Sequence, residues 1–267
     1  MDGDAREPQP VIDSSVPHSA RIVNYWLGGK DHYEVDQIAG ERVREVFPEI
    51  VDAARGSRQF LIRVVRYLAV EAGVRQFLDI GTGLPTAGNT HEIAQGVAPE
   101  SRVVYVDNDP LVLVHARALL TSTAEGATAY IDADVHDPEL IVQRAAETLD
   151  FDRPIAVILM GILAHIDEYE ESRSIVRRLM APLPAGSYLA VRDGADTNEA
   201  YNTAIAGYNK SGAIPYHLRS VEQIAAYLDG LDPVEPGLVS VPLWHPDPVE
   251  IGTPVEMAAF GGLARKP

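Results

Sequence analysis

Two glycines and an aspartate near the middle of the chain have the spacing of a nucleotide-binding turn. The stretch FLDIGTG (77–83) runs from apolar residues into Gly81 and Gly83, whose missing Cβ atoms let a ligand approach the backbone. Further along, RVVYVD (102–107) ends in Asp107, where a carboxylate could bind both hydroxyls of a ribose. The two glycines alone would also be consistent with a tight turn that binds no ligand. Together with Asp107, they predict an adenosine-containing ligand.

The residues that follow the glycine turn favour S-adenosylmethionine over a dinucleotide. The dinucleotide fingerprint has a third glycine after the second, so that a helix N-terminus meets the pyrophosphate. Thr86 stands at that place, and Pro85 before it removes an N–H donor and widens the turn. A nicotinamide-dependent oxidoreductase is therefore an alternative that these two residues disfavour.

A third acidic segment could complete the adenosine site. DADV (132–135) follows an apolar run, so the Asp134 carboxylate could accept a proton from an adenine amino group while the Val135 N–H faces the ring. The alternative for these aspartates is helix capping and solvation.

The elements that must position these residues follow from the alternation of apolar and helical segments. Five short apolar runs separated by helical stretches predict a parallel sheet covered by helices: 75–80, 102–107, 128–133, 154–160 and 187–193. Capping residues mark the helix starts, as at Asn89 before Glu92. Two late runs with prolines, 236–244 and 254–262, predict an antiparallel pair at the sheet edge. Ligands of such sheets bind beyond the carboxyl ends of the strands, where the glycine turn falls.

The N-terminal part of the chain predicts an arm and a helical cap. The proline-bearing polar stretch 1–17 predicts a flexible arm, and helical periodicity over 18–73 predicts a cap on a core formed by 74–267. Within the cap, NYWLGGKDHY (24–33) combines aromatic residues, tandem glycines and mixed charges. This combination favours a lid that closes over the ligand.

Four side chains of the cap are candidates for chemistry. Arg21 or Lys30 could pair with the carboxylate of a methionine group, and His32 or Tyr25 could take part in catalysis. The structural alternative is that Tyr25 is a core anchor and Lys30 a solvated surface residue.

Composition excludes several classes of protein. The 267 residues contain no cysteine, which excludes disulfides, thiolate nucleophiles and Cys-ligated metals. The formal net charge of -17 disfavours nucleic-acid and anionic membrane partners. Without a long apolar run or a signal-peptide pattern, we expect a cytoplasmic protein, monomeric or homodimeric.

The motifs together resemble the class I S-adenosylmethionine-dependent methyltransferases. The matching elements are FLDIGTG (77–83), VVYVDNDP (103–110), DADVHDP (132–138) and LPAGSYLAV (183–191) with Leu179. More closely, HSARIVNYWLGGKDHYEVD (18–36), RQFLDIGTGLPTAGNTHEIAQ (75–95) and LDFDRPIAVIL (149–159) resemble the actinobacterial S-adenosyl methyltransferase family. This resemblance implies an α/β fold: a Rossmann-like seven-stranded methyltransferase sheet with helices on both faces, the last two runs forming a reversed edge hairpin.

The resemblance also implies a role for individual residues. It assigns Asp79, Gly81 and Gly83 to the methionine portion of the cofactor, Asp107 to the ribose, Asn108 to the adenine and Asp134 to its amino group. Thr82, Val135 and Gly161 complete the predicted cofactor site. After the fourth strand the family reads closer to V-L-H-F, whereas this chain has MGILAH (160–165), so the resemblance says less about the acceptor.

His165 is the leading candidate for a catalytic base. It follows the fourth strand run in a loop expected to face the acceptor, where an imidazole titrates near neutral pH; a core histidine is the alternative. Methyl transfer can also proceed by positioning alone. No metal is predicted, because Met160-Gly161 and Asp193-Gly194 lack the ligands of a metal-assisted mechanism.

The leading functional hypothesis is a methyltransferase for a small-molecule acceptor. The fourth strand run lacks the Asn-Pro-Pro-Tyr type of stretch that holds a planar amino group, so amine and glutamine methylation are disfavoured. The main alternative is a module that senses S-adenosylmethionine or S-adenosylhomocysteine without turnover.

Overall fold

The strands near the glycine turn form because their side chains can be buried on both faces. Every residue of β1 (Gln76–Ile80) is buried, and β4 (Ala156–Met160) is buried up to its last residue. Side chains alternate, so Leu78 packs on one face of the sheet and Phe77 on the other. Apolar runs of this kind belong to a sheet covered by helices on both sides.

The computed structural model describes residues 12–119, 121–246 and 255–267. The remaining strands are β2 (Arg102–Asp107), β3 (Ala127–Asp132), β5 (Tyr188–Gly194), β6 (Asp232–Pro233), β7 (Val239–Ser240) and β8 (Ala259–Arg265). The helices are α1 (Ser19–Trp26), α2 (Glu34–Val46), α3 (Ile50–Val70), α4 (Thr90–Val97), α5 (Pro110–Leu119), α6 (Pro138–Ala145), α7 (Tyr169–Met180), α8 (Glu199–Tyr208) and α9 (Val221–Ala225), with short 3-10 turns η1 (Leu163–His165), η2 (Ala226–Leu228) and η3 (Val241–Leu243). The predicted arm falls mostly on residues 1–11, which lie outside the described residues.

The sheet has the strand order β3-β2-β1-β4-β5-β8-β6, with β7 also paired to β8. Strands β1 to β5 are parallel, and β8 runs antiparallel to β5 along its whole length. The order reverses at β1, so β1 and β4 form the switch point where ligands of open α/β sheets bind. The five predicted parallel strands and the Rossmann-like fold are confirmed.

The predicted edge strands differ from the observed ones. The run 236–244 contains only the two-residue strand β7 followed by the turn η3, because Pro236 and Pro242 cannot donate hydrogen bonds to a ladder. The run 254–262 begins at a residue outside the described part, and β8 continues beyond it to Arg265. Phe60 packs so closely on β8 that a Cβ on Gly261 would lie 2.7 Å from its ring. The close approach of Phe60 therefore explains the glycine at 261.

The capping residues begin the helices where the sequence predicts. Asn89 and Glu92 form a reciprocal capping box at α4, and Ser220 and Gln223 do the same at α9. The Asp137 side chain accepts a hydrogen bond from the backbone N–H of Leu140 at the start of α6. Local chemistry therefore sets where these helices start.

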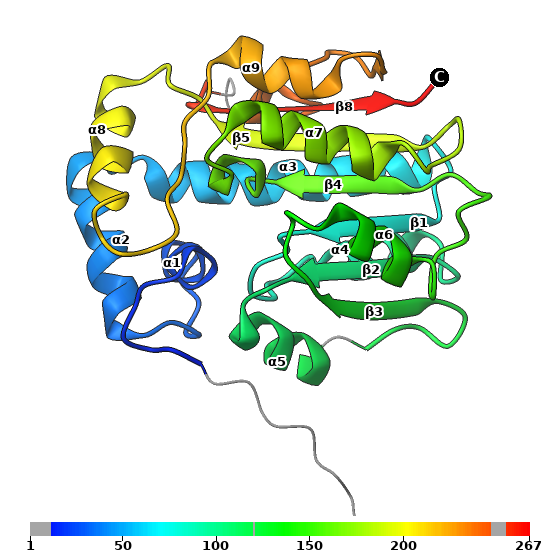
Figure 1. Ribbon diagram of the computed structural model, residues 1–267, viewed down its shortest axis with the longest axis horizontal. Helices are drawn as coiled ribbons and strands as arrows, with labels where there is room; N and C mark the ends of the chain where they lie inside the picture. Colours follow the sequence, from blue (N-terminus) through cyan, green and yellow to red (C-terminus); the bar gives the residue numbers. More distant parts are fainter. Residues whose placement is uncertain (1–11, 120, 247–254) are drawn as a thin grey trace, which may run out of the picture.

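Two helical layers cover the sheet. Figure 1 shows α6 and α7 in front of the strands and α3 and α4 behind them. Side chains of α6 and α7 share one buried cluster with β1, β2, β4 and β5, whereas the long helix α3 shares the opposite cluster with the same strands. Part of the segment 18–73 therefore belongs to the sheet core, since α3 lies along the sheet.

A third cluster holds the remaining N-terminal helices beyond the strand ends. Ile22 of α1 and Val43 of α2 pack with Tyr201 and Ile205 of α8. Helix α8 follows β5, far along the chain, yet it lies beside α2 in Figure 1. The cap over the carboxyl ends of the strands is thus built from both parts of the chain. Among the described residues, no helix has the length and apolarity needed to cross a membrane.

Candidate functional site

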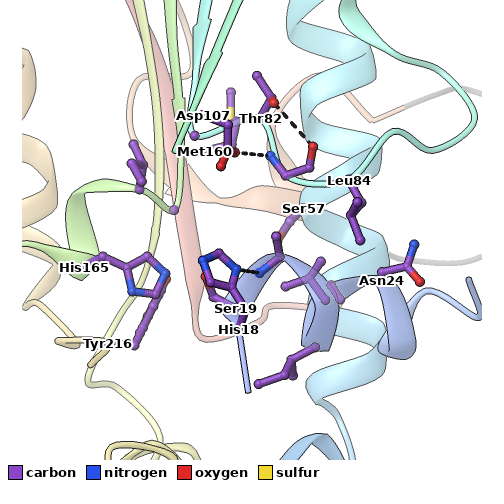
Figure 2. A pocket seen from close by; sticks show the side chains of 18 of the residues that line it. His18, Ser19, Asn24, Ser57, Thr82, Leu84, Asp107, Met160, His165 and Tyr216 are labelled. Carbon is purple, nitrogen blue, oxygen red and sulfur yellow. Dashed lines mark hydrogen bonds between the residues drawn. The ribbon is translucent and has the colours of Figure 1, made fainter. Parts of the chain in front are cut away.

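A cavity of about 290 Å³ lies between the carboxyl ends of the strands and the helices α1, α3 and α8. Figure 2 shows Leu84 and Asn24 at one end and His165 and Tyr216 at the other, with His18 between them. Ten of the predicted site residues line this cavity: Asp79, Gly81, Thr82, Gly83, Asp107, Asn108, Asp134, Val135, Gly161 and His165. Residues of four strand ends therefore meet around one space.

The glycine turn has backbone conformations that other residues adopt rarely. Gly81 and Gly83 have φ angles of 72° and 65°, in the left-handed region. A Cβ on Gly81 would lie 2.6 Å from Cβ of Ile162, in the loop after β4. Both glycines are thus required by the fold as well as by the approach of a ligand.

The Asp107 carboxylate is held at the cavity wall by two backbone amides. The Gly83 N–H donates to Oδ2 over 2.9 Å, and the Asp109 N–H donates to Oδ1 over 2.9 Å. Burial raises the pKa of Asp107, although these two hydrogen bonds oppose the shift. Each carboxylate oxygen keeps a lone pair for a further donor, so Asp107 can still accept hydrogen bonds from ligand hydroxyls.

The part of the cavity formed by β1 and α3 contains a buried carboxyl beside an arginine. Asp79 accepts a hydrogen bond of 2.6 Å from the Thr90 hydroxyl, and burial raises the pKa of Asp79 to about 6. The nearby Arg58 charge opposes that shift; its guanidinium donates to the Gly88 carbonyl over 2.7 Å and to Asn89 over 3.2 Å. Arg58 was not predicted, although it stands on the face of α3 that Ala54 and Leu61 share.

The first turn of α4 is already satisfied by a carboxylate. Glu92 accepts hydrogen bonds from the N–H groups of Gly88 and Asn89, at 2.9 and 2.8 Å. The Thr86 N–H donates to the Asn89 side chain over 3.1 Å. A pyrophosphate would have to displace the Glu92 charge, so this helix end is unsuited to a dinucleotide.

The residues that follow β2 and β3 form a small polar network at the cavity. The Asn108 amide donates to Oδ2 of Asp134 over 3.0 Å, and the His136 N–H donates to Oδ1 over 2.9 Å. Burial alone would raise the pKa of Asp134, but the His136 hydrogen bonds outweigh it and hold the pKa below its usual range. Asp134 is thus an ionised acceptor at neutral pH.

His165 lies at the opposite end of the cavity. Its Nδ1 is 2.8 Å from the carbonyl oxygen of Pro215, so Nδ1 carries the proton and Nε2 keeps a lone pair. Its ring meets the Tyr216 ring edge-on, with centroids 5.2 Å apart. Burial lowers the pKa of His165, which keeps the imidazole neutral at neutral pH and able to accept a proton.

The comparison with protein families decides the identity of the chain. A family model described as S-adenosyl methyltransferase matches residues 5–267. The chain belongs to this methyltransferase family. The predicted family and the predicted cofactor, S-adenosylmethionine, are therefore confirmed.

Two solved structures are similar to the methyltransferase over nearly its whole length. A DUF574 family protein from Streptomyces avermitilis has 44% identity and a TM-score of 0.92, covering 96% of this chain and 100% of its own. A protein from Thermobifida fusca, described as a candidate methyltransferase, has 37% identity and a TM-score of 0.88, covering 98% and 99%. An O-methyltransferase family protein from Burkholderia thailandensis has 16% identity and a TM-score of 0.53, covering 87% and 59%, which shows a common fold alone. Among curated proteins, no sequence matches this chain.

The cavity of the methyltransferase suits S-adenosylmethionine. The Thr86 hydroxyl oxygen is buried at the cavity wall without a hydrogen-bond partner among the described residues. Gly83 leaves its side of the cavity open, since a Cβ there would meet only Ala20, at 3.9 Å. With the Asp107 oxygens, these groups form a polar wall beside an open backbone, as a ribose linked to an amino-acid group requires.

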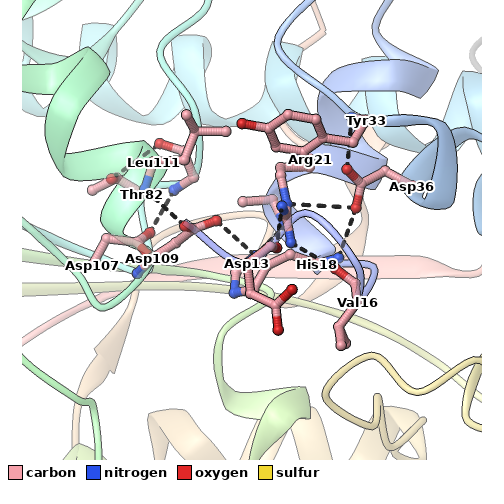
Figure 3. A network of polar contacts seen from close by, with 12 residues as sticks. Asp13, Val16, His18, Arg21, Tyr33, Asp36, Thr82, Asp107, Asp109 and Leu111 are labelled. Atoms are coloured by element: carbon pink, nitrogen blue, oxygen red, sulfur yellow. Dashed lines mark hydrogen bonds and ion pairs between the residues drawn. The ribbon is translucent and has the colours of Figure 1, made fainter. Parts of the chain in front are cut away.

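Four predicted residues lie away from the cavity. Lys30 is exposed, and the Tyr25 hydroxyl donates to Glu41 on α2. The His32 ring packs against Tyr25, with centroids 5.1 Å apart. Figure 3 shows the Arg21 guanidinium turned away from Asp107. The stretch 24–33 thus places none of its candidate catalytic groups at the cavity.

Arg21 holds the N-terminal segment instead. Its guanidinium donates to the carbonyl oxygens of Asp13 and Val16, at 3.0 and 2.8 Å, and its Nε lies 3.5 Å from the buried Asp36 carboxylate. His18, which sequence reasoning missed, begins α1 and lies 3.1 Å from Asp109, beside Asp107. In the sequence, a histidine that caps a helix looks like any other polar residue at a helix start. Only the contact of His18 with Asp109 shows that it lies beside Asp107.

We expect Arg21→Ala to lower stability without weakening cofactor binding. The substitution leaves Asp36 buried without its cation and should cost about 3 kcal/mol of unfolding free energy. Urea unfolding and calorimetric titration with S-adenosylhomocysteine measure the two quantities, with Arg44→Ala as the exposed control. A loss of affinity for S-adenosylhomocysteine without a loss of stability would instead indicate that Arg21 binds the cofactor.

Asp193→Asn is expected to stabilise the protein at pH 8 but not at pH 4. Burial raises the pKa of Asp193 from 3.8 to about 7. The protonated form therefore stabilises the fold below the unfolded pKa, and this contribution, on the order of 4 kcal/mol, is lost as the pH rises to about 7. Thermal unfolding at both pH values tests this, with the exposed Asp196→Asn as control. Equal shifts at both pH values would contradict it.

Proposed function

We propose that the protein methylates a small-molecule acceptor bound beneath α1 and α8. The observation that carries this proposal is that one cavity connects the predicted cofactor residues to His165. We call its far part the acceptor chamber; it is lined by Trp26, Ile50, Tyr201, Ile205, Tyr208 and Tyr216. Aromatic and aliphatic walls are typical of pockets for small apolar ligands.

The residues that would hold the cofactor follow the cavity wall from end to end. The glycine turn faces the methionine group, with Arg58 beside it as the candidate partner for the carboxylate. Asp107 would accept hydrogen bonds from the ribose, and Asp134 from the adenine amino group. When bound, S-adenosylmethionine supplies an electrophilic methyl group at the entrance to the acceptor chamber.

His165 favours an acceptor hydroxyl. Its Nε2 has a free lone pair, and its lowered pKa keeps it neutral, so it can take the proton that a hydroxyl loses as its oxygen is methylated. The Pro215 carbonyl would stabilise the resulting imidazolium through Nδ1. Among the described residues of the loop after β4, His165 is the one titratable group that lines the cavity. A hydroxyl acceptor would therefore make use of it.

Calorimetric titration with S-adenosylmethionine and S-adenosylhomocysteine, with NAD as control, tests the cofactor site. We expect micromolar binding of the first two and none of NAD. Incubation with an acceptor panel, followed by detection of S-adenosylhomocysteine, tests turnover. Binding without turnover across hydroxylated acceptors would support the sensor alternative, and binding of NAD alone would overturn the proposal.

A nucleic-acid acceptor is disfavoured. The net charge of -17 repels a phosphate backbone. The acceptor chamber lies beneath helices, so a polymer chain would have to pass between them to reach it. Salt-dependent RNA binding in a filter assay would contradict this part of the proposal.

A further inference from the structure

Arg192 is a charged side chain that lines the cavity and has no part in the proposed function. It stands near the end of β5, and a Cβ built on the neighbouring Gly161 would lie 3.1 Å from its Nη1. Its Nε is buried, and no atom of the described residues accepts a hydrogen bond from it. The Arg192 side chain also lines the cavity, so its guanidinium can pair with an anion bound there.

The adjacent Asp193 carboxylate does not accept a hydrogen bond from the Arg192 Nε. Asp193 follows Arg192 directly along β5, so its side chain points to the opposite face of the sheet. Its own Oδ1 is also buried without a hydrogen-bond partner among the residues described. The two charges interact through space, since the Arg192 charge opposes the rise in the pKa of Asp193.

The remaining charges of the cavity lie elsewhere. The carboxylates of Asp79 and Asp107 stand near the ends of β1 and β2, and that of Asp134 follows β3. Arg58 is bonded to the backbone of the β1–α4 turn. Among the described lining residues, these carboxylates therefore come from strands other than β5, and Arg192 is the charged residue that β5 contributes to the cavity.

The chamber presents other polar groups that suit a ligand. The Tyr208 hydroxyl is buried and has no hydrogen-bond partner in the described parts of the chain. Tyr216 lines the cavity together with Arg192 and His165; its hydroxyl accepts a hydrogen bond of 3.0 Å from the Gly194 N–H, and its ring contacts His165. A ligand on the face of Tyr216 could therefore reach the guanidinium and the imidazole together.

We propose that the acceptor is an apolar carboxylate, bound through its carboxylate to Arg192 with a hydroxyl directed to His165. This inference rests on the proposed function and specifies its substrate class. A guanidinium pairs with a carboxylate through parallel hydrogen bonds, and the aromatic walls would bind the apolar body. A single cation in a protein of net charge -17 suits a monoanion better than a phosphate dianion.

The test uses two matched pairs of probes on the protein loaded with S-adenosylhomocysteine. The pairs are 4-hydroxycinnamate with its carboxamide, and indole-3-acetate with its carboxamide; each pair differs only in the charged group. Calorimetric titration is expected to show the acids binding at least about tenfold more tightly than the amides. Arg192→Met should abolish this preference, and Arg192→Lys should restore part of it.

Control measurements separate this inference from the proposed function. S-adenosylhomocysteine should bind Arg192→Met within about twofold of the parent protein, and the exposed Arg177→Met should retain the acid preference. Equal binding of acids and amides, no binding of any probe, or an acid preference that survives Arg192→Met would overturn the inference. A large loss of S-adenosylhomocysteine binding in Arg192→Met would place the cofactor carboxylate at Arg192 and also overturn it. Failure of the parent protein to bind the cofactor would instead refute the proposed function.

Discussion

Replacing His165 with alanine should lower kcat by about 100-fold or more while leaving the affinity for S-adenosylhomocysteine unchanged. General-base catalysis contributes typically 10²–10⁴ to a rate, and the Nε2 of His165 has the free lone pair that this role needs. The measurement is formation of S-adenosylhomocysteine with a hydroxylated acceptor found by the turnover panel. The pH profile adds a second readout: since burial lowers the pKa of His165, activity should persist below pH 6.5 and fall only once the imidazole is protonated.

The control for this substitution is His217→Ala. His217 lies in the same part of the chain and contacts the η1 turn through its backbone N–H, which donates to the Ala164 carbonyl over 2.7 Å. Its side chain faces Asp167, at 3.4 Å, and does not line the cavity. Equal activities of His165→Ala and the parent protein would show that positioning alone drives the transfer.

Replacing Asp107 with alanine should weaken binding of S-adenosylmethionine by about 1–3 kcal/mol, the scale of hydrogen bonds to a charged group. The carboxylate also binds the N–H groups of Gly83 and Asp109, so its loss frees the glycine turn as well. Calorimetric titration measures the affinity, and thermal unfolding shows whether the fold is retained. Asp107→Asn keeps the side-chain shape and should give an intermediate loss.

Asp132→Ala is the matched control for Asp107. Asp132 pairs with Asp107 in the register of β2 and β3, but its side chain is exposed and does not line the cavity. We expect its affinity for S-adenosylmethionine to match that of the parent protein. An unchanged affinity in Asp107→Ala would mean that the ribose binds elsewhere.

Most of the parallel sheet could be predicted because its signals are local. Apolar runs such as 102–107 are buried on both faces, and capping residues such as Asn89 act within one turn of helix. The sheet edge was less predictable. Prolines shorten β7, and Gly261 of β8 looks like a turn residue but lies against Phe60.

The candidate site likewise has some residues that the sequence could predict and others that it could not. Gly81, Gly83 and Asp107 were predicted because each stands at a strand end, and parallel strands bring their carboxyl ends together. Arg21 and His32 were plausible candidates from residue type alone, yet their side chains contact the N-terminal segment and Tyr25. The residue types in a segment do not show which of its polar side chains point toward the ligand site.

The sequence alone determined the family, the fold class and the residues that line the cavity at the ends of β1 to β4, because these depend on contacts between residues close in the chain and on strand ends in a fixed order. Only the tertiary structure decided the acceptor chamber. It joins α1 with α8 and brings Arg192 and Tyr216 to His165, from segments with no periodic or spacing signal in common. Contacts between distant segments depend on how the helices pack, which no single stretch of sequence encodes.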